Sequence, residues 1–250
     1  YSIVNAAIKI TSAFRELHNS GRSYQDLNDG GFFIRPTDGD VLICDCDNIA
    51  PYGENLGIAG KPGYMAPEIV RGEKAPDKLT DRYSLAVVLF RLLLRGDPLE
   101  GGRVLKSVCL TEDAERRHYG YEPMFVYDPS DDSNRPVRGV HNNIIKFWRI
   151  MPDYIRDAFT VSFTDFSSRK SGLSKSSGLT SWCACAAISA PAPAAPRDLS
   201  PARSATPTER WSAPAVPTIS RHWRCILGNS AFCCLTAQSC SLMMSSVSAR

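Results

Sequence analysis

The sequence predicts an α+β protein, mostly α-helical, in which a small β-hairpin lies beside a loop of candidate catalytic residues. Three observations predict this class. Apolar residues recur at helical spacing over 3–18, two short apolar runs flank a Thr-Asp-Gly-Asp turn, and an almost wholly apolar segment occupies 85–94. The composition then changes, so we expect one folded domain over 1–165 and a Ser/Ala/Pro/Cys-rich tail over 166–250.

Composition excludes several classes of function. The net charge of the 250 residues is +3 and 22% of them are charged, which does not indicate nucleic acid or a membrane surface as a partner. We find neither an apolar run of spanning length nor an N-terminal signal pattern, and three cysteines before residue 166 fit a reducing, cytoplasmic setting. The chain begins at Tyr1 without Met, so we expect a fragment.

The first element is expected to be a helix over 3–18. Its apolar stripe comprises Ile3, Ala7, Ile10, Phe14 and Leu17, and it is core packing rather than a site. A glycine follows shortly after the stripe and is a suitable helix stop.

The predicted hairpin carries a carboxylate at each outer end. Asp26 lies in a Gly/Asn/Asp loop before the run Phe32–Ile34, and Asp45 follows the run Val41–Ile43. Two short strands joined by a tight turn can bring both carboxylates to one edge. Phosphoryl transfer needs one carboxylate near the nucleophile and one on a metal ion. For Asp26 alone, a turn-capping role is the alternative.

Downstream, a Gly/Pro-rich loop over 49–63 leads to a buried helix over about 80–95. Thr80 or Asp81 can cap its start, and the residues that follow are apolar on all sides, as in a helix buried all round.

The rest of the domain offers fewer signals. A short charged helix is expected near 113–118, and one or two amphipathic helices over 144–163, with a break at Pro152. The histidines His18, His118 and His141 lack partners at metal spacing and are interpreted as structural or exposed. We find no resemblance to a known segment over 97–143.

Two motifs near the hairpin resemble the landmarks of a protein kinase. Tyr24-Gln25-Asp26-Leu27 is similar to H-R-D-L, which opens the catalytic loop (24–31 here). Asp45-Cys46-Asp47 is similar to D-F-G, which opens the activation segment (45–68 here).

Two further motifs follow in the order that kinases use. Gly60 to Glu68 resembles the G-T-P-x-Y-M-A-P-E that closes the activation segment, and Asp81 to Ala86 resembles the D-x-W-S-x-G that opens a buried helix. The resemblance implies the C-terminal, large lobe of a divergent bacterial Ser/Thr protein kinase, with ATP and Mg²⁺ as cofactors and a protein as substrate.

The resemblance also implies roles for single residues. Asp26 would accept the proton of the attacking hydroxyl, Asp45 would hold magnesium on the nucleotide phosphates, and Asp47 is a candidate second ligand. Phe33 would form an apolar floor under adenine, with ordinary strand packing as the alternative.

Three residues are expected to support this site rather than take part in the chemistry. Tyr24 would fill space that the small Cys46 leaves. Glu68 would pair with an arginine, for which Arg149 and Arg156 are candidates, although the usual partner would lie after residue 165. Asp81 would bind backbone N–H groups of the catalytic loop or, in an ordinary buried helix, act only as an N-terminal charge.

Several positions depart from the kinase pattern. Gln25 replaces the arginine that grips a phosphorylated activation loop, Gly31 replaces the asparagine that holds a second metal ion, and Cys46 replaces phenylalanine. These changes favour the alternative of a pseudokinase or scaffolding module that binds a partner without catalysis. A small-molecule kinase of the same fold is a third option, against which the Met-Ala-Pro-Glu exit argues.

One pair of changes suggests a compensation. Asn28 stands at the position of the catalytic-loop lysine, and Lys61 at that of the activation-segment threonine. Our hypothesis is that the two positions exchange roles, with Lys61 bringing the positive charge to Asp26 and Asn28 a neutral hydrogen bond. The alternative is a solvated Lys61.

This sequence does not contain the first part of the kinase pattern, and its tail does not continue the last part. No glycine-rich loop, strand lysine or helix glutamate precedes Asp26, so we expect the N-terminal lobe of the same parent to be missing and the fragment alone to be inactive. The segment Gly178–Ala186 can be encoded so that a one-base shift reads WTDFLVRLR, a helical pattern. The tail is therefore either out of frame or a true low-complexity, disordered extension.

Overall fold

The computed structural model describes residues 2–58, 60–106 and 111–164, so the expectations for the tail lie outside the described residues. Helices dominate, and the strands form two separate antiparallel pairs. The elements are α1 (Ser2–Asn19), β1 (Arg22–Tyr24), η1 (Asp29–Gly31), β2 (Phe32–Ile34), β3 (Val41–Ile43), η2 (Cys46–Asn48), β4 (Ile49–Pro51), α2 (Pro67–Val70), α3 (Lys78–Leu94), η3 (Val104–Lys106), α4 (Glu112–Arg116), the π-turn η4 (Arg117–Tyr121), α5 (Asn142–Ile150) and α6 (Asp153–Thr164).

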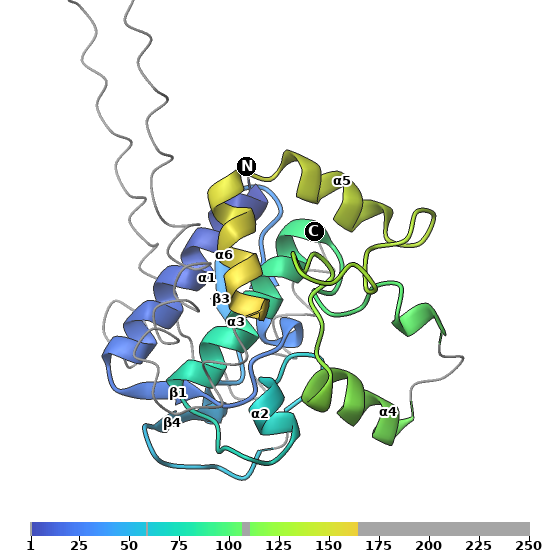
Figure 1. Ribbon diagram of the computed structural model, residues 1–250. Coiled ribbons are helices and arrows are strands. Elements are labelled where there is room, and N and C mark those ends of the chain that lie inside the picture. The colour runs from blue at the N-terminus through green and yellow to red at the C-terminus, as the bar shows by residue number, and fades with distance from the viewer. Residues whose placement is uncertain (1, 59, 107–110, 165–250) are drawn as a thin grey trace, which may run out of the picture.

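Helix α3 is the central element and packs against α1, α5, α6 and β1 (Figure 1). Its buried residues face every direction because the segment has almost no polar side, as the sequence predicts. The predicted N-cap is wrong. Asp77 caps the helix, and its side chain accepts hydrogen bonds from the backbone N–H groups of Leu79 and Thr80 in a capping box.

Aromatic rings from distant parts of the chain form the centre of the core around Phe90 of α3. The ring of Phe90 makes edge contacts with those of Phe125, Phe159 and Phe163, at centroid distances of 5.8, 5.2 and 5.9 Å. Edge-to-face geometry is the favoured arrangement of such rings. This cluster ties α6, and the segment before α5, to the central helix.

The predicted hairpin is present as β2 and β3, and its turn lies against the start of α1. Gly39 has φ of +70°, and a Cβ there would come within 2.0 Å of the Ser2 carbonyl oxygen. Glycine is therefore required for the close approach. Lys9 of α1 also pairs with Asp40 at 3.0 Å, which fixes the hairpin beside the helix.

One strand pair was not predicted. β4 lies in the segment that the sequence suggests is a loop, and it pairs antiparallel with β1, with Ser23 opposite Ala50. A three-residue strand that ends in proline leaves no alternating pattern to detect. The pairing places the start of the candidate activation segment directly beside the start of the candidate catalytic loop.

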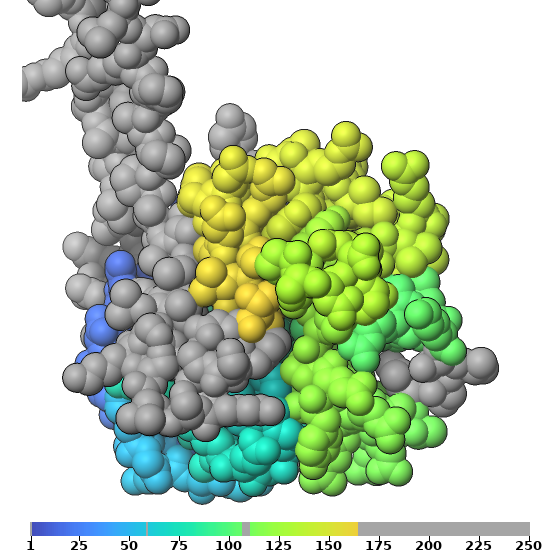
Figure 2. Space-filling view, viewed as in Figure 1, coloured from blue at the N-terminus to red at the C-terminus, as the bar shows by residue number. Residues whose placement is uncertain are grey.

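The space-filling view shows α5, α6 and the segment before them as one continuous surface (Figure 2). Both helices lie where the sequence predicts them, with the break at Pro152, and the charged helix α4 is also confirmed. Across the described ranges we find no helix of the length and apolarity that spanning a membrane requires.

We predict that Phe90→Ala destabilises the fold by about 3–5 kcal/mol, because it leaves a cavity between α3, α6 and the segment that carries Phe125. Ile150→Ala is the matched control, since that side chain is 72% exposed and should change stability by less than about 0.5 kcal/mol. Denaturant unfolding measures both. Equal effects of the two changes would contradict the central place of α3.

Candidate functional site

The candidate catalytic loop begins at β1 and is built around the side chain of Asn28. Its amide nitrogen donates to Asp26 Oδ1 at 3.2 Å and to the Asp26 carbonyl at 3.1 Å. Its amide oxygen accepts from the Gly30 N–H at 3.0 Å, which caps η1. Asn28 therefore fixes the half-buried carboxylate of Asp26 relative to the loop.

Lys61 reaches the same group from the activation segment. Its Nζ donates to Asn28 Oδ1 at 3.2 Å, although much of the residue is exposed. The neighbouring backbone passes close to Asp26, since a Cβ on Gly60 would lie 3.5 Å from Asp26 Oδ1. The structure thus brings Asp26, Asn28 and Lys61 together, with the amide between the carboxylate and the ammonium group.

Asp45 lies at the end of β3 with an exposed carboxylate and a left-handed backbone, φ 57° and ψ 44°. The preceding residue is fixed on two sides. Cys44 N–H donates to the Gly31 carbonyl at 2.9 Å, and the Tyr24 hydroxyl donates to the Cys44 carbonyl. Asp45 is therefore held beside the catalytic loop.

The phenol of Tyr24 is influenced by both candidate carboxylates. Burial raises its pKa well above the ordinary value, and the charges of Asp45 and Asp26 raise it further. Both carboxylates are therefore close enough to one buried ring to act on it. Tyr24 also packs in the same apolar cluster as Cys46.

The remaining candidates on this side are exposed. Asp47 lies on η2 beyond Asp45, and Phe33, at 41% exposure, faces outward from β2, so its ring is only partly packed. Among the described residues we find no group of three His, Cys, Asp or Glu side chains that could enclose a metal ion. A cation here would rely on few protein oxygens.

Asp81, in the first turn of α3, anchors the start of the candidate catalytic loop. Its Oδ2 accepts from the Tyr24 backbone N–H at 2.6 Å and lies 3.1 Å from His18 Nε2, and its side chain is 3% exposed. Burial raises the pKa of Asp81 to about 6, which the hydrogen bond and charge of His18 partly oppose. One carboxylate thus joins α3, α1 and β1.

The exit of the activation segment is held by Tyr64, which is buried at 5% exposure. Arg91 Nη1 donates to its hydroxyl at 2.7 Å, and the guanidinium carbon lies 4.2 Å from the centre of its ring. Arg91 in turn donates through Nε to the buried carboxylate of Asp97 at 3.0 Å. This chain of contacts connects the end of α3 to the exit loop.

The arginine partner expected for Glu68 stays a prediction, and the usual partner would lie outside the described residues. Glu68 lies in α2 and is half-buried, and its charge acts on Arg71. Arg156, one expected partner, donates instead to Asp153 in its own helix, and Arg149, the other, is exposed.

Two contacts next to the candidate site could not be predicted from the sequence. A lone histidine has no metal or catalytic spacing, so the sequence predicts His18 only as structural or exposed, and its contact with Asp81 bears out the structural alternative. Gln25 was noted only as a missing arginine, whereas its side chain binds the backbone of residues 54–56. Both contacts join segments that are far apart in the sequence.

Comparisons with known proteins identify the family. A family model described as the protein kinase domain matches residues 2–151, including the stretch 97–143 for which we found no resemblance. The chain belongs to the protein kinase domain family.

Among its relatives, the chain is 35% identical to the Ser/Thr-protein kinase AtPK1/AtPK6 of Arabidopsis thaliana over 98 residues, which are 38% of this chain and 21% of the relative. It is 34% identical to a probable cAMP-dependent protein kinase catalytic subunit of Encephalitozoon cuniculi over 93 residues, 37% of this chain and 28% of the relative. It thus spans about a fifth to a quarter of these proteins.

We predict that Asp81→Asn flattens the pH dependence of stability between about pH 4 and 6. The pKa of Asp81 rises from an ordinary 3.8 to about 6 on folding, so in this window the folded protein holds more protons than the unfolded one. The wild type therefore loses stability through this group as the pH rises, whereas the amide keeps an oxygen for the Tyr24 N–H and does not titrate.

Denaturant unfolding at a series of pH values measures this difference, with Asp157→Asn as the control for the loss of one exposed negative charge. Identical slopes for the wild type and Asp81→Asn would show that the buried carboxyl does not contribute.

Proposed function

We propose that residues 2–164 form the large lobe of a Ser/Thr protein kinase of bacterial type, which transfers the γ-phosphoryl group of ATP to a protein hydroxyl in the cytoplasm. The single observation that carries this proposal is the chain of contacts Asp26–Asn28–Lys61, with Asp45 just beyond the end of strand β3. Membership of the protein kinase family supports the reaction class.

In the proposed reaction, the substrate hydroxyl oxygen attacks the γ-phosphorus while the bond from this phosphorus to the β–γ bridging oxygen breaks. Asp26 accepts the hydroxyl proton, and ADP leaves. The Asn28 amide keeps the Asp26 carboxylate in place through its hydrogen bond to Oδ1. Positioning and charge stabilisation supply most of the catalysis, because the protein forms no covalent bond in this reaction.

Magnesium and ATP would lie on the Asp45 side of the loop. Mg²⁺ retains several waters and is held by one or two carboxylates together with phosphate oxygens, which fits the exposed Asp45 and Asp47. When bound, the ion would neutralise charge on the β- and γ-phosphates. The exposed ring of Phe33 would provide the apolar surface for adenine.

Lys61 would supply the positive charge that the catalytic loop lacks. In the proposed exchange of roles, its ammonium group is placed by Asn28 Oδ1, 3.2 Å away, and a flexible four-carbon stem lets it reach the transferring phosphoryl group. The contact with Asn28 favours this role over a wholly solvated side chain.

The proposal assigns the clamp on the ATP phosphates to an N-terminal lobe of the same parent protein. The glycine-rich loop and strand lysine of the family do not occur before Asp26. Without them water remains around the phosphates, so the 250-residue chain by itself should bind ATP weakly and transfer little phosphate. Readily measured phosphorylation by the isolated chain would refute this part.

The alternative is a pseudokinase that retains the fold to bind a partner. The observation that favours it is Gly31, which brings no ligand for a second metal ion and approaches the Tyr24 hydroxyl so closely that a Cβ would lie 3.3 Å from it. A larger side chain at this position would require Tyr24 to move.

We predict that Asp26→Ala lowers phosphoryl transfer by the intact parent protein by about 10²–10⁴-fold and leaves nucleotide binding intact, since only proton acceptance and orientation are lost. Asp45→Ala should abolish the magnesium dependence of nucleotide binding. Calorimetric titration with and without Mg²⁺ and a phosphate-transfer assay test both, with Asp157→Ala as control. If the parent protein binds a partner and Asp45→Ala does not change its nucleotide binding, the pseudokinase alternative holds.

We also predict that Lys61→Ala lowers kcat of the parent by about 10²-fold with little change in KM for ATP, because the charge acts on the transition state. Lys61→Arg should retain part of the rate. Lys106→Ala, another exposed lysine, is the matched control. Full activity of Lys61→Ala would show that the lysine does not act in the reaction, and would refute the hypothesis that Lys61 and Asn28 exchange roles.

A further inference from the structure

The side-chain amide of Gln25 is buried, at 7% exposure, and both of its ends bind backbone groups of the activation segment. Nε2 donates to the Glu54 carbonyl at 2.5 Å, and Oε1 accepts from the Leu56 N–H at 2.9 Å. The backbone N–H of Gln25 adds a third bond, to the Asn48 carbonyl at 3.0 Å. The residue directly before Asp26 is thus fixed to two points of the segment.

Residues 54–56 have little else to hold them. The side chains of Glu54, Asn55 and Leu56 are all exposed, so none of them anchors the segment in the core. Exposed segments without buried side chains open locally at low free energy unless their backbone groups are bonded. The Gln25 amide provides two such bonds from a buried position.

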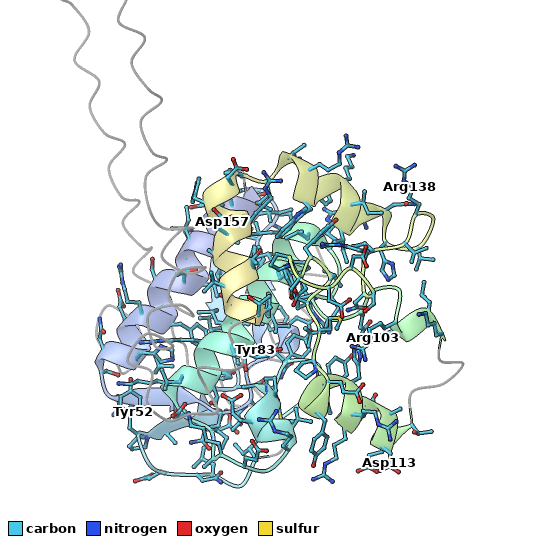
Figure 3. All side chains as sticks on the ribbon, in the orientation of Figure 1. Tyr52, Tyr83, Arg103, Asp113, Arg138 and Asp157 are labelled. Carbon is cyan, nitrogen blue, oxygen red and sulfur yellow. The ribbon has the colours of Figure 1, made fainter. Side chains whose placement is uncertain are left out.

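The segment itself offers few places for a phosphate. Residues 45–68 contain no serine or threonine, and their two tyrosines both have engaged hydroxyls. The Tyr52 hydroxyl, on the β1–β4 side of the molecule (Figure 3), donates to the His18 carbonyl. The hydroxyl of Tyr64 accepts from Arg91 at 2.7 Å, within a buried residue.

We propose that Gln25 is a positioning residue that holds the first half of the activation segment by binding its backbone, so that the segment needs no phosphate to reach its working position. An arginine would require an acceptor such as a phosphate, whereas a neutral amide pairs equally with a C=O and an N–H group. The name activation segment rests on the proposed function, whereas the hydrogen bonds of Gln25 are independent of that function.

This clamp also couples the segment to the candidate base. Gln25 and Asp26 are adjacent, and Lys61 of the same segment reaches Asn28 two residues later. Release of residues 54–56 would therefore loosen a segment whose other end supplies the ammonium group.

The test is amide hydrogen exchange in the 250-residue chain, read at the Leu56 amide as a protection factor. Gln25→Met removes both hydrogen bonds at similar volume, and we expect protection to fall by roughly tenfold. Protection in α3 should not change, which separates a released segment from a misfolded domain. Ser23→Ala is the control, because Ser23 is equally buried and its hydroxyl finds no hydrogen-bond partner among the described residues.

Gln25→Glu provides a readout that packing alone would not move. Its ionised carboxylate still accepts from the Leu56 N–H but has no proton for the Glu54 carbonyl, which its charge repels, so protection should fall below the wild-type value at pH 8. Its protonated form has the donor and the acceptor of the amide, so protection should return toward wild type at pH 5. Phosphatase treatment of the wild type should leave protection at Leu56 unchanged.

Wild-type protection in Gln25→Met, or a loss of protection after phosphatase treatment, would overturn the clamp. Because exchange needs no nucleotide, these outcomes are independent of catalysis. Absence of phosphoryl transfer by the intact parent would end the proposed function and leave the clamp in place.

Discussion

The buried carboxylate of Asp81 is the interaction on which the rest of the site depends. A carboxyl group taken from water is costly unless donors surround it, and here the Tyr24 N–H and the His18 ring provide them at 2.6 and 3.1 Å. Because α3 is apolar on all sides, its start is the place where a polar group can meet both α1 and β1. The hydroxyl of Tyr24 donates to the Cys44 carbonyl, so the segment that leads from β3 to Asp45 is tied to the same anchor.

Asp45 itself is held in a conformation that few residues adopt. A left-handed backbone disfavours a side chain, although aspartate tolerates it better than most residues. Such conformations persist where the surroundings determine them, and they cluster at functional sites. Here backbone hydrogen bonds fix Asp45 on both sides. The Cys44 N–H donates to the Gly31 carbonyl, and the Asn48 N–H donates to the Asp45 carbonyl at 3.1 Å. These bonds therefore hold the exposed Asp45 beside the candidate catalytic loop.

The elements that repeat a pattern could be predicted, and those that depend on a single contact could not. α1 and α3 follow from periodicity and from an all-apolar run, and the hairpin from two runs around a turn. The cap of α3 was misplaced because Asp77 stands in a Gly/Pro-rich stretch, where an aspartate resembles a turn residue. The contacts of His18 and Gln25 join positions 63 and 29–31 residues apart, so no local spacing could reveal them.

Two departures from the family pattern in the candidate catalytic loop have one effect in common, which is that they remove positive charge. The catalytic loop, residues 24–31, contains two carboxylates and no lysine or arginine, because amides stand where the family pattern has Arg and Lys. An amide can bridge two neighbours but brings no charge, so Asn28 can orient Asp26 without neutralising it. The cation that the structure brings to Asn28 is Lys61, from the activation segment. Under the proposed function, the positive charge near Asp26 depends on that segment, and the uncharged contacts of Gln25 with residues 54–56 would help to keep it in place.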